Sequence, residues 1–302
     1  MSSVQADALP RLLAGIPVHG HMGLAAHRAR HGELPVGGRR NRAWASALVD
    51  EVERSGLRGR GGAAFPLARK LGAVREARGR AVVVANACEG EPASAKDRLL
   101  LERLPHLVLD GALTAAAAVG APDVVFAVDD EAVAAAHALR AAIDERGDVR
   151  RLGQRVSLQA VPRGYVSGQE SAVVNFLSGG PAKPRATPPM VFQRGVQGRP
   201  TLVSNVETLG HLALVARHGA DWFRALGTPA EPGSTLVTLS GAVAHPGVYE
   251  IELGVPLEML LEAAGGPTRP LRAFVLGGYA GSWVPAAVAR RRATGAGTQL
   301  PA

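Results

Sequence analysis

Three short apolar runs, at residues 81–87, 123–129 and 156–161, constrain the fold of this 302-residue chain more than any other feature. The first run is apolar and rich in valine, which is typical of a buried strand, and the other two are expected as a second and a third strand. Helical patterns at 105–119 and 131–145 lie between them. Strands that alternate with helices predict an α/β sheet covered on both faces.

Other segments complete the predicted organisation. Further helices are expected at 9–13, 41–54, from about residue 66, at 168–178 and at 203–219, followed by a hairpin at 235–254, a helix at 255–266 and a strand at 273–278. The last three elements suggest a small β-grasp-like module. We therefore expect an irregular leader at 1–40, an α/β domain at 41–228, a β-grasp-like domain at 229–289 and a basic tail or truncation point at 290–302.

The amino-acid composition argues against several classes of function. The net charge is +8, but aromatic residues make up only 4% of the chain, too few for a base-stacking surface, so nucleic acid is not an expected partner. No apolar run reaches the length of about 18 residues that spans a membrane. The expected location is cytoplasmic, either free or peripheral to a membrane complex. A single cysteine excludes an intrachain disulfide and an iron–sulfur cluster held by this chain alone.

A glycine-rich loop precedes the helix that starts near Pro66. Gly59, Gly61 and Gly62 let the backbone approach a ligand closely, and Lys70 follows one turn into the helix. Unpaired N–H groups, the positive end of the helix dipole and the lysine together predict a cradle for a phosphate-type anion. The alternative is a plain turn between two helices. The loop follows a helix rather than a strand, which argues against the dinucleotide fingerprint.

The segment NACEGEP, residues 86–92, follows the first predicted strand, where open α/β sheets bind ligands. Asn86, Glu89 and Glu91 would project from this loop toward a ligand, or stand there as the solvated groups of an ordinary turn. Cys88 has four interpretations: a nucleophile, a metal ligand, a small core residue or a substitute for another residue. The chain offers it no second thiol and no nearby histidine, which disfavours the first two.

Two more segments place polar groups at expected helix starts. Tyr165 and Gly168 precede a helix with Glu170 in its first turn, where a carboxylate serves either as a cap or as a ligand group. Asn205 and Thr208 open another helix with an amide and a hydroxyl suited to phosphate or ribityl oxygens. The remaining segments carry weaker signals of a functional site.

For charged and histidine residues outside these motifs, the sequence predicts only their position on the surface. Lys96 and Asp97 are adjacent and are expected to form a surface ion pair. His211 and His218, seven residues apart, are expected on a helix surface. No metal-type histidine pair and no hydrolase nucleophile motif occur in the sequence, so no metal site and no catalytic side chain is predicted.

The order SGLRGRGGAAFP, NACEGEP, GYVSGQESA and VSNVET resembles the flavin-binding subunit of respiratory complex I and its relatives in soluble hydrogenases and formate dehydrogenases. The resemblance covers about residues 40–285. It implies a Rossmann-like flavin-binding domain followed by a small β-grasp domain of the soluble-ligand-binding (SLBB) type. In that family the glycine loop and the lysine hold FMN, and NADH passes a hydride to the flavin, which carries the redox chemistry.

The resemblance implies site residues position by position. Phe65 and Glu91 match positions on the NADH side. The positions implied for FMN are Gly59, Gly61, Gly62, Lys70, Asn86, Cys88, Glu89, Tyr165, Gly168, Glu170, Ser204, Asn205 and Thr208.

Several positions depart from the family pattern. Cys88, Gln169 and Ser204 replace an aspartate, a carboxylate and an asparagine. The nucleotide side has lost aromatic and cationic groups at Leu71, Ala73, Thr187 and Met190. The neutral thiol of Cys88 in place of an aspartate predicts a raised flavin reduction potential.

The leading hypothesis is an FMN-binding oxidoreductase subunit that takes hydride from NADH and passes single electrons to an iron–sulfur or thioredoxin-like partner subunit. The alternative is a divergent flavin-fold subunit that no longer oxidises NADH and serves as a binding or assembly component, or takes electrons from another redox protein. The changes on the nucleotide side motivate the alternative.

Overall fold

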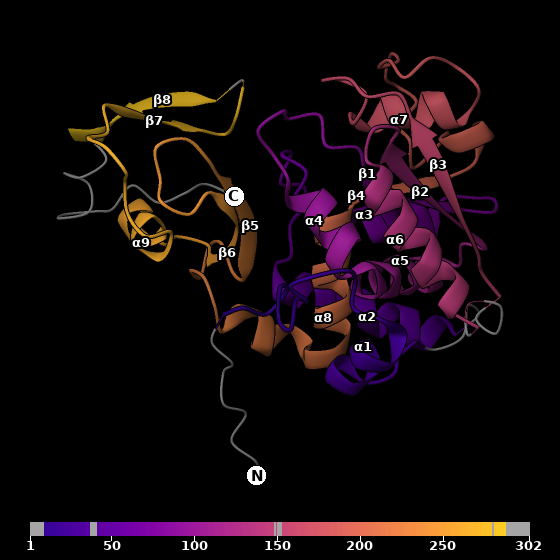
Figure 1. Ribbon diagram of the computed structural model, residues 1–302. Helices are drawn as coiled ribbons and strands as arrows, with labels where there is room; N and C mark the ends of the chain where they lie inside the picture. Colours follow the sequence, from indigo (N-terminus) through magenta and orange to yellow (C-terminus); the bar gives the residue numbers. More distant parts are fainter. Residues whose placement is uncertain (1–8, 37–40, 148, 150–152, 280, 288–302) are drawn as a thin grey trace, which may run out of the picture.

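A computed structural model describes residues 9–36, 41–147, 149, 153–279 and 281–287. Figure 1 shows a larger α/β part and a smaller part at its side, which begins after the last long helix. The larger part contains a four-stranded sheet with the order β3-β2-β1-β4. All three pairings are parallel, and the strands are β1 (Val82–Ala87), β2 (Asp123–Asp129), β3 (Arg155–Val161) and β4 (Thr201–Asn205). The predicted α/β class is confirmed.

Alternate residues of β1 face two separate apolar clusters, as the two-residue period of a strand requires. Val83 and Ala85 pack into the main core, whereas Val82 and Val84 pack on the opposite face. Both faces of the sheet are therefore covered at β1, which explains why β1 reads as a continuous apolar run, whereas the edge strand β3 is largely exposed. The helices of this part are α1 (Leu24–His31), α2 (Arg42–Ser55), α3 (Leu67–Glu76), α4 (Lys96–Arg103), α5 (Pro105–Val119), α6 (Val133–Glu145), α7 (Glu170–Leu177) and α8 (Val206–Arg224), with a short 3-10 helix η1 (Val196–Gly198).

The packing of α5 against α8 fixes the main core. Every residue of α5 is buried. A Cβ at Gly111 would lie 1.8 Å from the carbonyl oxygen of Leu209, so the two helices come into backbone contact there. Because α8 starts directly after β4, this packing also fixes where the amino end of α8 lies at the sheet.

The smaller part consists of two antiparallel hairpins and one helix. They are β5 (Ser234–Leu239) with β6 (Gly247–Glu252), α9 (Leu257–Ala263), and β7 (Ala273–Leu276) with β8 (Ser282–Pro285). Its core is small and centres on Ile251, Leu257 and Leu260. The predicted hairpin, helix and following strand are all present, and β8 is an additional strand that the sequence pattern did not indicate.

Three expectations about secondary structure were wrong. Residues 9–13 form turns and no helix, because the N–H groups of Arg11, Leu12 and Leu13 donate to the Glu250 carboxylate, each at 2.9 Å, instead of forming helical bonds. The leader predicted as irregular contains α1. The helix expected at 203–219 starts only at residue 206, since the preceding residues belong to β4.

No helix among the described residues is long and apolar enough to cross a membrane. The division of the chain at residues 40, 228 and 289 stays a prediction, and the predicted basic tail lies outside the described residues.

Candidate functional site

Two asparagines lie side by side at the carboxyl edge of the sheet. Asn86 of β1 and Asn205 of β4 are partners in the parallel register. Asn86 Nδ2 donates to the carbonyl oxygen of Gly168 at 2.7 Å. Asn205 Oδ1 accepts from the N–H of Glu207 at 3.0 Å and so caps α8, while its Nδ2 donates to Asp97 at 2.5 Å. Asn86 therefore holds the loop before α7, and Asn205 ties α4 to the amino end of α8, at the edge where open α/β sheets bind ligands.

The glycine loop lies against the amino end of α8. The N–H of Arg60 donates to Thr208 Oγ1 at 2.8 Å. A Cβ at Gly61 would lie 3.3 Å from Cβ of Asn205, so a side chain there would press on the helix cap. Gly62 has φ +99° and open space where a Cβ would stand. Among the described residues, no hydrogen-bond acceptor faces the N–H groups of Gly61 and Gly62, which leaves both donors available to a ligand.

Lys70 extends from the first turn of α3 toward the same edge. Its Nζ donates to Glu170 Oε1 at 2.9 Å and to the carbonyl oxygen of Val203 at 3.2 Å. The two charged side chains are 30% and 34% exposed, so the ion pair is open to solvent on one side. An ammonium has three N–H donors, and two are used here. The third is available for an anion next to β4.

The loops that follow β1 and β3 are in backbone contact. A Cβ at Gly168 would lie 2.5 Å from the carbonyl oxygen of Cys88, and a Cβ at Gly90 would lie 2.4 Å from the carbonyl oxygen of Tyr165. Only glycine permits this approach at either position. The predicted residue Gly168 thus brings two predicted segments together.

Cys88 is a buried residue. Its Sγ lies 3.6 Å from the carbonyl oxygen of Ala127, and it packs in the apolar cluster that contains Val173 and Val174. Burial, reinforced by the nearby Asp129 carboxylate, raises the pKa of the thiol far above its ordinary value. Of the four interpretations, the small core residue fits best, and a thiolate nucleophile fits worst. The predicted contact of Cys88 with the flavin stays a prediction.

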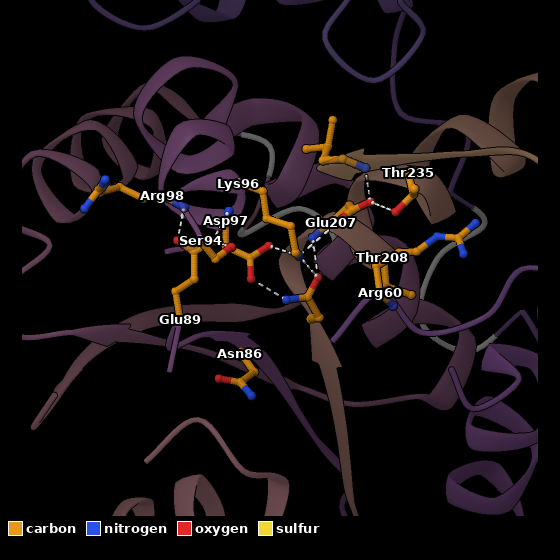
Figure 2. Close-up of polar contacts among 12 residues, drawn as sticks. Arg60, Asn86, Glu89, Ser94, Lys96, Asp97, Arg98, Glu207, Thr208 and Thr235 are labelled. Carbon is orange, nitrogen blue, oxygen red and sulfur yellow. Dashed lines mark hydrogen bonds and ion pairs between the residues drawn. The ribbon is translucent and has the colours of Figure 1, made fainter. Parts of the chain in front are cut away.

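Behind the edge lies a buried network of charges, drawn in Figure 2. Lys96 Nζ is 2.8 Å from Asp97 Oδ1 and 2.8 Å from Glu207 Oε2. Glu207 Oε1 accepts from the N–H of Leu236 at 2.8 Å and from Thr235 Oγ1 at 3.0 Å, both on β5. The expectation of a surface ion pair between Lys96 and Asp97 was wrong, because their side chains are only 17% and 4% exposed.

The buried network shifts the pKa values of its two acids in opposite directions. Burial raises the pKa of Asp97 to about 6, only partly opposed by Lys96. Burial also opposes the ionisation of Glu207, but Lys96 and then His211 outweigh it and hold the pKa of Glu207 at about 2. Asp97 and Glu207 outweigh burial in raising the pKa of Lys96. The lysine and Glu207 are therefore charged at neutral pH.

The acidic residues of the loop after β1 have distinct roles. Glu89 accepts from the N–H groups of Asp97 at 3.1 Å and Arg98 at 3.3 Å, so it caps α4. Glu91 Oε2 accepts from the N–H of Tyr279 at 2.8 Å, which joins this loop to the turn between β7 and β8.

The sequence analysis did not predict the ion pair between Lys96 and Glu207. The one signal that could have pointed to Lys96 is the rarity of lysine, since only three of the 34 basic residues are lysines.

Positions that depart from the family pattern differ in surroundings. Leu71 is fully buried in the core, so it faces no ligand, whereas Met190 is 44% exposed. Phe65, which matches the family pattern on the NADH side, is 46% exposed. Gln169 caps α7 by accepting from the N–H of Ser171 at 2.7 Å. His211 is 1% exposed, so its predicted place on a helix surface was wrong.

These groups fit a cofactor with a phosphate and a polar ring. The free N–H groups of Gly61 and Gly62 and the third donor of Lys70 suit a phosphate. The amino end of α8 adds the positive end of a helix dipole at the same edge. Among the described residues no group of histidine, cysteine and acidic side chains would hold a metal ion.

Comparisons with known proteins agree with this chemistry. The model of the Nuo51 FMN-binding domain matches residues 52–213, and that of the SLBB domain matches residues 236–278. A subunit of the NADH-quinone oxidoreductase of Rhizobium meliloti, designated F 2, is 37% identical over 251 residues, which are 79% of this chain and 60% of that protein. The alpha subunit of the NAD-reducing hydrogenase HoxS of Cupriavidus necator is 35% identical and shares 80% of this chain and 41% of its own length.

The structural comparison gives the same result. A crystal structure of an NAD+-reducing NiFe-hydrogenase in the air-oxidized state aligns with a TM-score of 0.79 and 35% identity, over 88% of this chain and 47% of that chain. The chain spans about half the length of the relatives it matches. The match to an FMN-binding domain agrees with the predicted cofactor. The chain belongs to the family of the Nuo51 FMN-binding domain, here followed by an SLBB domain.

Proposed function

We propose that this chain binds FMN at the carboxyl edge of its parallel sheet and passes a hydride from NADH to it. Single electrons then leave to an iron–sulfur or thioredoxin-like partner subunit. The observation that carries the proposal is that the glycine loop and the Lys70 ammonium both contact β4 and both keep free donors. The loop, whose Gly61 and Gly62 have free N–H groups, approaches Asn205 at the end of β4, and the partly exposed ammonium of Lys70 donates to Val203. This donor set matches a phosphate monoester and leaves the ring to the polar side chains at the ends of β1 and β4.

The roles of the individual residues follow from their contacts. Lys70 would neutralise the phosphate, and Glu170 positions the lysine by its ion pair at 2.9 Å. Asn86 would hold the loop before α7 beside the ring, and Asn205 would fix the amino end of α8 there. Thr208 fixes the glycine loop through the N–H of Arg60. When bound, FMN supplies the ability to take two electrons as a hydride and release them singly.

The alternative, a flavin-fold subunit without NADH oxidation, draws its support from the nucleotide side, where Ala73, Thr187 and Met190 stand in place of the family's aromatic and cationic groups. The names of the relatives, which are subunits of NADH-quinone oxidoreductases and an NAD-reducing hydrogenase, favour the first proposal. The nature of the electron-accepting partner and the cytoplasmic location remain predictions.

The test has two stages and a matched control. FMN is first titrated into the purified chain, and binding is followed by quenching of flavin fluorescence, for the wild type, Lys70→Met and Lys183→Met. Lys183 is exposed and belongs to the loop that follows α7. We expect Lys70→Met to bind FMN at least about tenfold more weakly, because a hydrogen bond to a charged group contributes about 1.5–3 kcal/mol. Lys183→Met should bind like the wild type.

The second stage adds NADH to the FMN-loaded chain under anaerobic conditions and follows flavin absorbance. Bleaching supports hydride transfer. Flavin that stays oxidised under excess NADH would reject the first proposal in favour of the alternative. A chain that takes up no FMN would reject the first proposal and would leave, of the alternative, only the binding or assembly role.

A further inference from the structure

The turn between β7 and β8 carries an aromatic side chain that packing does not explain. Tyr279 is 82% exposed, although it sits where two parts of the molecule meet. Its N–H donates to Glu91 at 2.8 Å, and its ring is 5.8 Å from the ring of Tyr165, at an interplanar angle of 64°. In Figure 1 the tip of the β7–β8 hairpin points toward the larger part.

The position of the turn is set by close contacts. Gly278 has φ +75°, and a Cβ there would lie 2.3 Å from Cδ of Glu91, so only glycine lets the turn come this close. Glu91 Oε1 in turn accepts from the N–H of Ala93 at 3.2 Å. The carboxylate is therefore held by its own loop on one side and by Tyr279 on the other. The tyrosine is anchored by its backbone, while its ring remains in solvent.

Tyr165 supplies the second ring. It is 55% exposed and belongs to the loop that contacts Gly90. Two exposed rings at a steep angle form an open aromatic corner, next to the Glu91 carboxylate. Aromatic faces of this kind stack on planar heteroaromatic rings, and a carboxylate accepts hydrogen bonds from ribose hydroxyl groups.

We propose that Tyr279, carried in by the second domain, forms with Tyr165 a binding face for a planar ring of the dinucleotide substrate. The inference rests on the proposed function, since it names a binding residue for the same site. It gives the SLBB domain a direct part in substrate binding. Adenine and nicotinamide share the required chemistry, and the test separates them.

The experiment measures binding rather than turnover. ADP-ribose and nicotinamide mononucleotide are titrated separately into FMN-loaded protein by isothermal titration calorimetry. The variants are Tyr279→Ala, Tyr279→Phe and Trp283→Ala. Trp283 is the matched control because it is 75% exposed on β8 of the same hairpin. FMN affinity is measured in parallel for each variant.

We expect Tyr279→Ala to weaken one of the two fragments by about 5- to 100-fold, the range for loss of one base–aromatic stack. The fragment that weakens identifies the ring. Tyr279→Phe should stay within about twofold of the wild type, since it keeps the stacking face. Trp283→Ala should bind both fragments, and Tyr279→Ala should take up FMN, as the wild type does.

Two results would overturn the inference and leave the proposed function intact. One is an unchanged affinity of Tyr279→Ala for both fragments in protein that takes up FMN normally. The other is an equal loss in Trp283→Ala, which would point to the stability of the hairpin. If the wild type takes up no FMN and binds neither fragment, the proposed function and the inference both fail.

Discussion

Replacement of Lys96 by methionine tests the buried charge network most directly. The ammonium lies 2.8 Å from one oxygen each of Asp97 and Glu207. Methionine keeps most of the apolar stem and removes the charge. Two buried carboxyl groups, those of Asp97 and Glu207, then lose the ammonium that lies against both of them.

The expected loss is large because the pair is buried. Removing one partner of a buried ion pair costs about 3–5 kcal/mol. Glu207 keeps its two bonds from β5, and Asp97 keeps its bond from Asn205, which places the expected loss near the lower end, about 3 kcal/mol at pH 7. This loss in the free energy of unfolding should become smaller as the pH falls, because protonation removes the charge of the unpaired carboxylates.

Urea unfolding followed by circular dichroism measures the change. Lys183→Met is the matched control, and this exposed site should change the free energy of unfolding by less than about 0.5 kcal/mol. A Lys96→Met variant that is as stable as Lys183→Met at pH 7 would refute the reasoning. So would a penalty that grows on acidification, since that is the opposite of what two unpaired acids produce.

Three further predictions concern packing, reactivity and pH. Gly168→Ala should weaken FMN uptake, because its Cβ would lie 2.5 Å from a backbone oxygen, whereas Gly72→Ala has open space and should take up FMN normally in a fluorescence titration. Cys88 should react with a disulfide reagent in the unfolded chain but hardly in the native one, because burial raises the pKa of the thiol; equal rates would contradict its burial. Burial lowers the pKa of His106 from 6.5 to about 4, so its contribution to stability is full above pH 6.5 and is lost as the pH falls toward 4. In urea unfolding between pH 7 and 4.5, the free energy of unfolding should fall less for His106→Gln than for the wild type. For the exposed His19→Gln it should fall as it does for the wild type.

The sequence alone predicted those elements that depend on residues close together in the chain. The valine runs of β1 and β2 are buried on both faces, so their apolar character is continuous and unmistakable. The glycine loop and the helix behind it were predictable because both depend on residues within one turn of each other. The hairpin of β5 and β6 is likewise a local pairing.

What the sequence did not predict depends on partners far along the chain. Asn205 and Asp97 are 108 residues apart, and nothing near either position indicates their hydrogen bond. Residues 9–13 have a helical pattern, but Glu250 takes up their N–H groups from more than 230 residues away. β4 was missed because its five residues run without a break into α8, and the joint apolar stretch has the period of a helix.

The amino end of α8 joins the candidate site to the second domain. Asn205 caps the helix at the edge of the sheet, and Thr208 holds the glycine loop. Between them, Glu207 receives two hydrogen bonds from β5 and an ion pair from Lys96. A shift of β5 would therefore act on the same helical turn that supports the cradle. Because a buried carboxylate cannot lose its partners without a large penalty, the second domain and the site are expected to keep one relative arrangement.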